Sequence, residues 1–144
     1  MTSGYASSPP EQARVDTNGL LRLLLDDNPD QSPRTHQWFD GPHEQLPRLV
    51  VAASTISEVV FTLGGPRLKY VRDEILVALD RILEMPVEFD EPSVIRTAIE
   101  LYRTVHDDWD DCLVAAYALE RSGGVVFSFD RGLDRIPGIT RIEP

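Results

Sequence analysis

Apolar residues in the second half of the chain recur at three- and four-residue intervals, which is the period of an amphipathic helix. The segment from Arg67 to Met85 carries such a stripe and ends before a proline, so it predicts a helix. Asp90-Glu91-Pro92 offers a cap, an early acid and an early proline, and predicts a second helix that reaches about Val105. The run from Asp110 to Leu119 is apolar all round, and predicts a central buried helix.

Shorter apolar runs that end in polar, glycine or proline residues predict strands. The predicted strands are residues 13–16, 49–52, 87–89, 125–129 and 139–142. Helices are expected after the first two strands, one with a polar start at Thr17-Asn18 and one capped by Ser54 or Thr55, and a short helix is expected at Thr35–Phe39. Strands that alternate with helices indicate an α/β fold with a mainly parallel sheet and helices on both faces.

Length and composition favour one globular domain. The chain has 144 residues, of which 42% are hydrophobic and 26% charged. Residues 1–12 are rich in Ser, Gly and Pro and predict a disordered extension, which leaves residues 13–144 for the domain. The longest apolar run falls short of the roughly 18 to 20 residues of a membrane span, and the N-terminus does not resemble a secretory signal, so we expect no membrane association and a cytoplasmic protein.

Charge and cysteine content narrow the chemistry. A formal net charge of -10 argues against a protein that holds nucleic acid on a broad basic face, but not against one that cuts it with cations held by carboxylates. The single cysteine, Cys112, excludes an internal disulfide and a multi-cysteine zinc site, and its apolar surroundings predict core packing. His36, His43 and His106 lack zinc-type spacing and are expected to be solvated loop or helix-end residues.

Four acids are expected at one edge of the predicted sheet. Asp16 and Asp130 each end a strand, whereas Glu58 and Asp111 lie near the start of a helix. In parallel α/β sheets, ligands bind beyond the carboxyl ends of the strands, where helix N-termini also point. We therefore expect these four carboxylates to converge, although each acid taken alone has an ordinary explanation as a turn residue or a partner of a helix dipole.

A carboxylate cluster of this kind suits Mg²⁺ or Mn²⁺, because hard divalent cations select oxygen ligands. Such a cation polarises a phosphodiester, lowers the pKa of a bound water and stabilises the leaving oxygen. The natural reaction is hydrolysis of a nucleic-acid backbone.

Four segments carry a resemblance to a known family. They are VDTNGLLRLL, ISEVVFTL, DWDDCLVAAYAL and VVFSFDRGLDRI, and their order resembles that of the motifs of PIN-domain ribonucleases over nearly the whole chain from Ala13. The resemblance implies a three-layer α/β/α fold with a mainly parallel central sheet, and an endoribonuclease that uses Mg²⁺ or Mn²⁺. The implied metal ligands and catalytic residues are Asp16, Glu58, Asp111 and Asp130.

The resemblance also implies supporting residues and partners. Thr17 or Asn18 and Ser128 match polar positions that support the acids by hydrogen bonds, and Asp134 matches a peripheral helper. The length and motif spacing resemble VapC-type toxins of type II toxin-antitoxin systems. An RNA substrate, a cognate antitoxin and a homodimer are the partners that this implies.

The sequence departs from the motif around the third acid. Cys112 stands where the family has a small residue, and the run Asp107-Asp108-Trp109-Asp110-Asp111 holds more acids than the motif requires. Asp111 is the expected ligand because the apolar run follows it directly, and Asp107 or Asp108 is expected to cap the helix. Which of Asp107, Asp108 and Asp110 assists Asp111 stays open.

Other polar and aromatic residues have two interpretations each. Arg131 and Arg135 either contact phosphate or neutralise neighbours such as Asp134, and the second interpretation is preferred. Trp109 and Tyr102 either stack on a base or anchor the core or an interface, and again the second is preferred.

Two other functional classes compete with the nuclease. The first is a catalytically silent binding module whose acidic pocket receives a basic residue from a partner protein. The second is a phosphoryl-transfer domain, of the receiver or haloacid-dehalogenase-like type. The latter type needs Asp-x-Asp at its first strand, where this chain has Asp16-Thr17-Asn18, and no convincing acceptor Asp of a receiver is found mid-chain.

Overall fold

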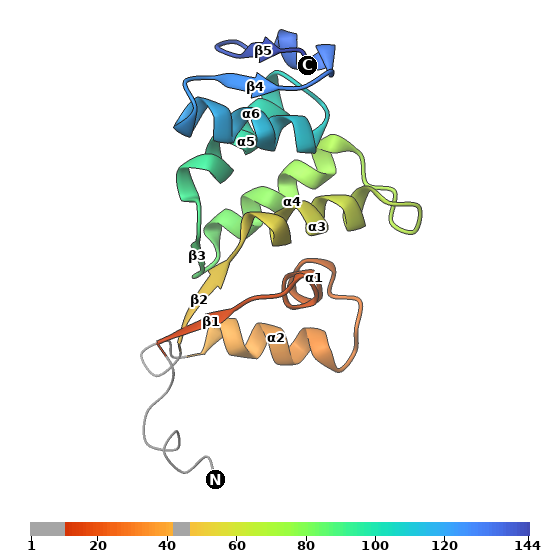
Figure 1. The fold of residues 1–144 in the computed structure, drawn as a ribbon. Coiled ribbons are helices and arrows are strands. Elements are labelled where there is room, and N and C mark those ends of the chain that lie inside the picture. Colours follow the sequence, from red (N-terminus) through yellow and green to blue (C-terminus); the bar gives the residue numbers. More distant parts are fainter. Residues whose placement is uncertain (1–10, 42–46) are drawn as a thin grey trace. The chain divides into compact units, whose positions relative to one another are not determined.

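Strands and helices alternate along the chain, as Figure 1 shows for the computed structural model, which describes residues 11–41 and 47–144. The elements are β1 (Gln12–Arg14), α1 (Thr17–Leu25), α2 (Gln31–Asp40), β2 (Arg48–Val51), α3 (Ala53–Gly64), α4 (Arg72–Glu84), β3 (Glu88–Phe89), α5 (Pro92–Thr104), α6 (Trp109–Arg121), β4 (Val125–Phe127), the 3-10 helix η2 (Arg131–Arg135) and β5 (Thr140–Ile142). They form two compact units, residues 1–59 with 78–90 and residues 60–77 with 91–144. We call these the first and second units.

A three-stranded parallel sheet organises the first unit. Its strand order is β1-β2-β3, with Ala13 opposite Leu49 and Val51 opposite Phe89. Helical segments lie between successive strands in the chain, as parallel pairing requires. The apolar core of this unit is contributed by α1, β2 and the parts of α3 and α4 that belong to it, namely Leu20, Leu21, Leu23, Leu24, Val50, Val51, Ala53, Ile56, Val59, Ala78, Leu79 and Ile82.

The second unit is built on the packing of α5 against α6, which lie side by side in Figure 1. Tyr102 and Trp109 are both buried and meet edge to face with their ring centroids 5.6 Å apart, so the predicted core role of these two aromatics is confirmed. β4 and β5 pair in parallel beside a cluster of buried side chains. The cluster consists of Ala115, Ala118, Val126, Leu133 and Ile136.

Two glycines allow β4 and β5 to begin close together. Gly124 and Gly138 have φ angles of 80° and 85°, which L side chains rarely adopt. A side chain at Gly124 would also collide with the carbonyl oxygen of Gly138, whereas the Gly124 carbonyl accepts a hydrogen bond from Thr140 N at 2.8 Å. The strand pairing therefore requires glycine at position 124.

The expected α/β class is confirmed, because every recorded strand pairing is parallel and helices separate the strands of the first sheet. The extents of several elements differ from the prediction. Gln12, expected in the N-terminal extension, begins β1. Residues 1–10 lie outside the described part of the chain, and so does His43.

The helix predicted from Arg67 begins five residues later, at Arg72. Lys69 has a φ of 56° and so cannot continue a right-handed helix. The helix starts where the Glu74 carboxylate accepts a hydrogen bond from Val71 N at 3.0 Å. Val71, expected in the buried stripe, is 63% exposed.

The starts of two earlier helices were also predicted wrongly. α3 begins at Ala53, and the carbonyl oxygen of Ala52 accepts hydrogen bonds from Thr55 N and Ile56 N, so Ser54 and Thr55 lie inside the first turn rather than at the cap. α2 begins earlier than expected, at Gln31. Asn28 Oδ1 supports this start by accepting hydrogen bonds from Asp30 N at 3.0 Å and from Gln31 N at 2.7 Å.

Burial was overpredicted in two elements of the second unit. α6 is buried along one side only, and Val114 is 48% exposed. The strand predicted at residues 125–129 ends at Phe127, and within β4 only Val126 is buried. Phe127 and Phe129 are 73% and 70% exposed. A continuous apolar run thus concealed the period-two alternation of a strand with one buried face.

Candidate functional site

Asp16 is held at the start of α1. It directly precedes the helix as its N-cap, and its Oδ1 accepts a hydrogen bond from Gly19 N at 2.8 Å. An aspartate suits this position because its short side chain reaches a backbone N–H that has no partner inside the helix. The cap uses one carboxylate oxygen, and the side chain is exposed.

Glu58 is tied to the same helix start, although it is 41 residues away in sequence. Thr17 Oγ1 donates a hydrogen bond to Glu58 Oε2 at 2.7 Å. Because Thr17 is the neighbour of Asp16, this bond brings α3 to the point where α1 begins. We refer to Asp16 and Glu58 as the first acid pair. Both belong to the first unit.

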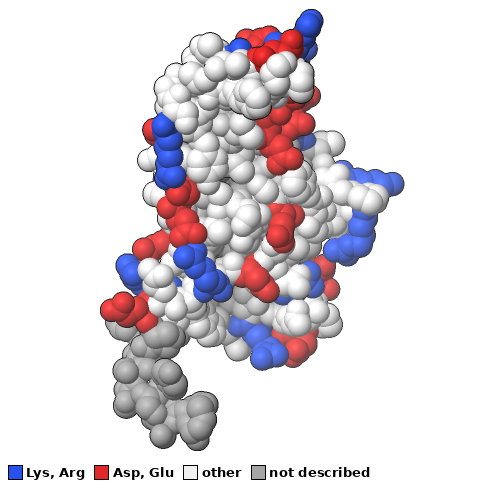
Figure 2. Space-filling model, in the orientation of Figure 1, with Lys and Arg blue, Asp and Glu red and all other residues white. Residues whose placement is uncertain are grey.

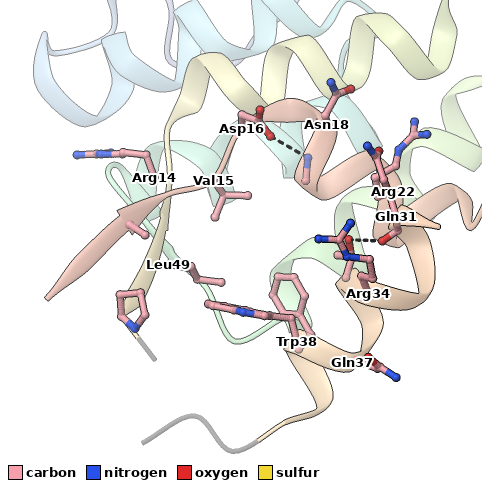
Figure 3. Close-up of a pocket in the computed structure, with 15 residues that line it drawn as sticks. Arg14, Val15, Asp16, Asn18, Arg22, Gln31, Arg34, Gln37, Trp38 and Leu49 are labelled. Carbon is pink, nitrogen blue, oxygen red and sulfur yellow. Dashed lines mark hydrogen bonds between the residues drawn. The ribbon is translucent and has the colours of Figure 1, made fainter. Parts of the chain in front are cut away.

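A cavity of about 920 Å³ adjoins Asp16 within the first unit (Figure 3). Its walls include Asn18 from α1, Leu49 from β2, and Arg34 and Trp38 from α2. Trp38 is 41% exposed and offers an aromatic surface to this space. Polar and apolar groups thus line one opening next to the first acid pair.

The guanidinium groups around this cavity have acidic neighbours. Arg34 contacts Asp30 at 3.3 Å in an exposed pair. Arg22 contacts Asp27 at 3.1 Å, and its Nε is buried with no hydrogen-bond partner among the described residues. On the face drawn in Figure 2, the described Lys and Arg side chains occur in separate small groups.

Asp111 is fixed in the first turn of α6. The helix is capped by Asp108, whose Oδ1 accepts a hydrogen bond from Asp111 N at 3.1 Å, so the predicted capping role is confirmed for Asp108. The Asp111 carboxylate itself lies 2.8 Å from Nε2 of His106, measured from Oδ2. Its side chain is 20% exposed.

The prediction that His106 is a solvated residue was wrong. Its side chain is only 7% exposed, and it forms the contact with Asp111. His36, in α2, does lie at the surface, 3.6 Å from Asp26. The pattern around His106 gave no sign of burial, because the residue stands in a polar stretch between two helices.

Asp130 is placed beside Asp111 by the loop after β4. It is the N-cap of η2, where its Oδ1 accepts a hydrogen bond from Gly132 N at 2.8 Å and its own N–H donates to Ser128 Oγ at 2.9 Å. A Cβ atom at Gly132 would lie 3.0 Å from Asp130 Oδ1 and 3.9 Å from Asp111 Oδ2. The two carboxylates therefore border one small space that a side chain at position 132 would fill. We call Asp111 and Asp130 the second acid pair.

The electrostatics of Asp111 reflect this crowding. Burial raises the pKa of the Asp111 carboxyl above its usual value, and the hydrogen bond from His106 opposes that rise. The negative charges of Asp108 and Asp130 raise it further. A divalent cation relieves repulsion of this kind, so the second acid pair fits a hard cation in both charge and donor type.

Asp134 lies on η2, and its carboxylate bonds Arg141. Its carboxylate receives two hydrogen bonds from Arg141, at 3.0 Å from Nε and 3.2 Å from Nη2, and these hold the pKa of Asp134 below its usual value. Arg141 Nη1 also donates to the Ser128 carbonyl oxygen at 3.0 Å. The main partner of Asp134 is thus Arg141, a residue that the sequence interpretation did not single out. Arg131 adds a weaker effect of the same sign, and Arg135 is exposed.

The acids therefore form one pair in each unit. Within residues 11–41 and 47–144, no group of three or more His, Cys, Asp or Glu side chains is arranged to hold a metal ion. That all four acids share a cation stays a prediction. In the same part of the chain, no helix is long and apolar enough to cross a membrane.

The family to which the chain belongs follows from comparison with known proteins. No curated protein matches the chain. The PIN domain family matches residues 14–139, which include all four acids and nearly every element described above. The chain therefore belongs to the PIN-domain family, whose members are generally nucleases.

Proposed function

We propose that this protein is a divalent-metal-dependent endoribonuclease in which Asp16, Glu58, Asp111 and Asp130 together hold Mg²⁺ or Mn²⁺. The observation that carries the proposal is the second acid pair, because two carboxylates border the same space at Gly132, and burial together with the charges of Asp108 and Asp130 raises the pKa of Asp111. The first acid pair adds oxygen donors that Gly19 and Thr17 hold in place. When bound, the cation supplies charge stabilisation to the phosphodiester and activates a water.

The residues of the chain have separate tasks in this scheme. Gly19 N–H and Thr17 Oγ1–H orient the first acid pair, and Gly132 N–H orients Asp130. The cavity beside Asp16 is the proposed place for the RNA, where the exposed ring of Trp38 offers a surface for a base. Its volume lies in the range of small-molecule sites, which suits one or two nucleotides rather than a duplex.

Further parts of the proposal depend on the resemblance to VapC-type toxins. We propose that the protein is the toxin of a toxin-antitoxin pair, with an antitoxin as its partner, that it forms a homodimer, and that it acts in the cytoplasm. A monomeric mass in light scattering at tens of micromolar would argue against the homodimer.

The test of the nuclease is the substitution Asp16→Asn. Asparagine caps helices about as well as aspartate, so the fold should persist while one anionic ligand is lost. RNA cleavage by the purified protein should fall by at least about 100-fold, because a metal ion contributes several kcal/mol of transition-state stabilisation. Asp110→Asn is the matched control, since Asp110 is an exposed acid next to Asp111 that belongs to neither acid pair. Wild-type cleavage by the Asp16→Asn protein would refute the proposal.

A silent binding module is the second candidate, and one observation favours it. Asp111 already bonds a basic side chain, His106, in the manner that a partner's basic residue would be received. Calorimetric titration of the wild-type protein with Mn²⁺ separates the two functions. The nuclease must bind the ion, whereas the module need not.

A further inference from the structure

His106 is unusual among the polar residues of this protein. In the part of the chain that the structure describes, Ser32 and His106 are the buried polar or charged residues. Ser32 lies in the first turn of α2, where its hydroxyl accepts a hydrogen bond from Asn28 N. His106 instead places a ring nitrogen against a carboxylate of the second acid pair.

The backbone of His106 is fixed on both sides. Its N–H donates to the Leu101 carbonyl oxygen at 2.9 Å, at the end of α5. Its carbonyl oxygen accepts from Cys112 Sγ at 3.4 Å, in the first turn of α6. The residue therefore bridges the end of one helix and the beginning of the next.

The ring is confined as well. A Cβ at Gly132 would lie 3.4 Å from Cε1 of the imidazole, so the backbone of η2 lies close to the Cε1 edge of the ring. In this buried position, Nε2 lies 2.8 Å from Asp111 Oδ2.

We infer that His106 is a positioning residue, which fixes the Asp111 carboxylate beside the space at Gly132 by donating Nε2–H to Oδ2. The direction of donation follows from chemistry, because an ionised carboxylate can only accept. This role rests on the proposed function. Partners that orient metal-binding side chains in this way typically change metal affinity by about 10- to 100-fold when they are removed.

The test compares two neutral polar substitutions that differ in reach. In His106→Gln, the side-chain amide nitrogen stands about as far from Cα as imidazole Nε2 and can donate to Asp111. In His106→Asn, it stands near the place of Nδ1 and falls short. Mn²⁺ affinity is measured by calorimetry on the full chain, and folding by the midpoint of thermal unfolding. His36→Asn, at the exposed histidine of α2, is the control.

We expect His106→Asn to weaken Mn²⁺ binding by about 10- to 100-fold, and His106→Gln to stay within about threefold of wild type because it keeps the donor. The control should bind as wild type. Equal affinities of the Gln and Asn variants, whether both normal or both reduced, would overturn the inference, because a purely structural histidine would not separate them by reach.

A second readout does not depend on the metal. In the metal-free wild-type protein, nitrogen-15 NMR of the histidine rings should show His106 protonated at Nε2, with the proton protected from exchange, and Asp111→Asn should perturb this signal. A ring protonated at Nδ1 alone would refute the contact. A wild-type protein that binds no Mn²⁺ but shows the expected ring would overturn the proposed function, and the role given to His106 with it, while the contact stands.

Discussion

In the second acid pair, Asp111 is held by a different kind of partner from either acid of the first pair. In the first unit, Asp16 and Glu58 are exposed and bonded to neutral groups close to the start of α1, a backbone N–H and a threonine hydroxyl. In the second unit, Asp111 is partly buried and bonded to an imidazole that is itself enclosed, whereas Asp130 is exposed and bonded, like Asp16, to a backbone N–H. A buried partner confines a carboxylate more strongly than an exposed hydroxyl does, since water competes less for the same hydrogen bond.

Within the proposed site, the acids are therefore expected to contribute in different ways. The first acid pair is exposed close to the start of α1, and the cavity beside Asp16 offers room for a substrate. Asp111 lies in the first turn of α6, against the imidazole of His106 that follows α5 and close to Gly132 of η2. We therefore expect rigid positioning from Asp111 and adaptation to the substrate near the first acid pair.

The largest expected effect tests whether the two units are energetically separate. Leu20 in the first unit and Ile95 in the second are both fully buried. Leu20→Ala and Ile95→Ala should each destabilise the fold by about 2 to 5 kcal/mol. If the chain is one domain, as its length and composition predict, both variants should shift the same single transition in urea. Two transitions, with one variant affecting each, would contradict that prediction.

An effect of intermediate size on Mn²⁺ affinity is expected at Thr17, whose hydroxyl bonds Glu58 of the first acid pair. Thr17→Val removes the hydroxyl that bonds Glu58 and keeps the shape of the side chain. Mn²⁺ affinity should fall by about three- to tenfold, less than for His106→Asn, because the lost bond is exposed.

Thr97→Val is the matched control for Thr17. It removes the same type of bond, a 2.9 Å threonine to glutamate contact with Glu120, between α5 and α6. This contact involves neither acid pair, so Mn²⁺ affinity should not change. If Thr17→Val weakened Mn²⁺ binding as much as His106→Asn does, Glu58 and Asp111 would not be held to different degrees by their partners.

The smallest expected effect depends on pH and concerns the contact between Asp134 of η2 and Arg141. Arg141 holds the pKa of Asp134 below its usual value of 3.8, so the stabilisation from this contact is present above that value and is lost as pH falls through the lowered pKa. Asp134→Asn should lower the unfolding midpoint slightly near pH 7, because Asp134 is exposed, and the difference from wild type should disappear once the pH lies below the lowered pKa. A difference that is undiminished in acid would show that the effect is not the ion pair.

Much of the fold could be predicted from local patterns. The start of α5 was predictable to within one residue because Pro92 favours the first helical position, although the N-cap is Glu91 and not the expected Asp90, whose carboxylate instead bonds Arg14. β3 was predictable because Val87 and Phe89 flank a single polar residue before a turn. Helix boundaries failed where one residue adopts an unusual conformation. The left-handed Lys69 delays α4, and no pattern of apolar positions reveals a φ angle.

The candidate acids could be located from the sequence, but their partners could not. Asp16, Asp111 and Asp130 stand at helix starts, as strand ends and apolar runs predicted. The bonds that hold them often come from elsewhere in the chain, as with Thr17 for Glu58, or depend on burial, as with His106. Spacing in sequence reports neither, since both follow from how helices and loops pack.

The buried cysteine has a practical consequence. Cys112 is the only thiol in the chain, it is fully buried, and burial raises its pKa to about 12. Thiolate is the form that reacts with alkylating reagents, so the folded protein offers them no effective target near neutral pH. A cysteine introduced at an exposed position, such as one end of the proposed RNA cavity, can therefore take a fluorophore or spin label selectively without removal of the native residue.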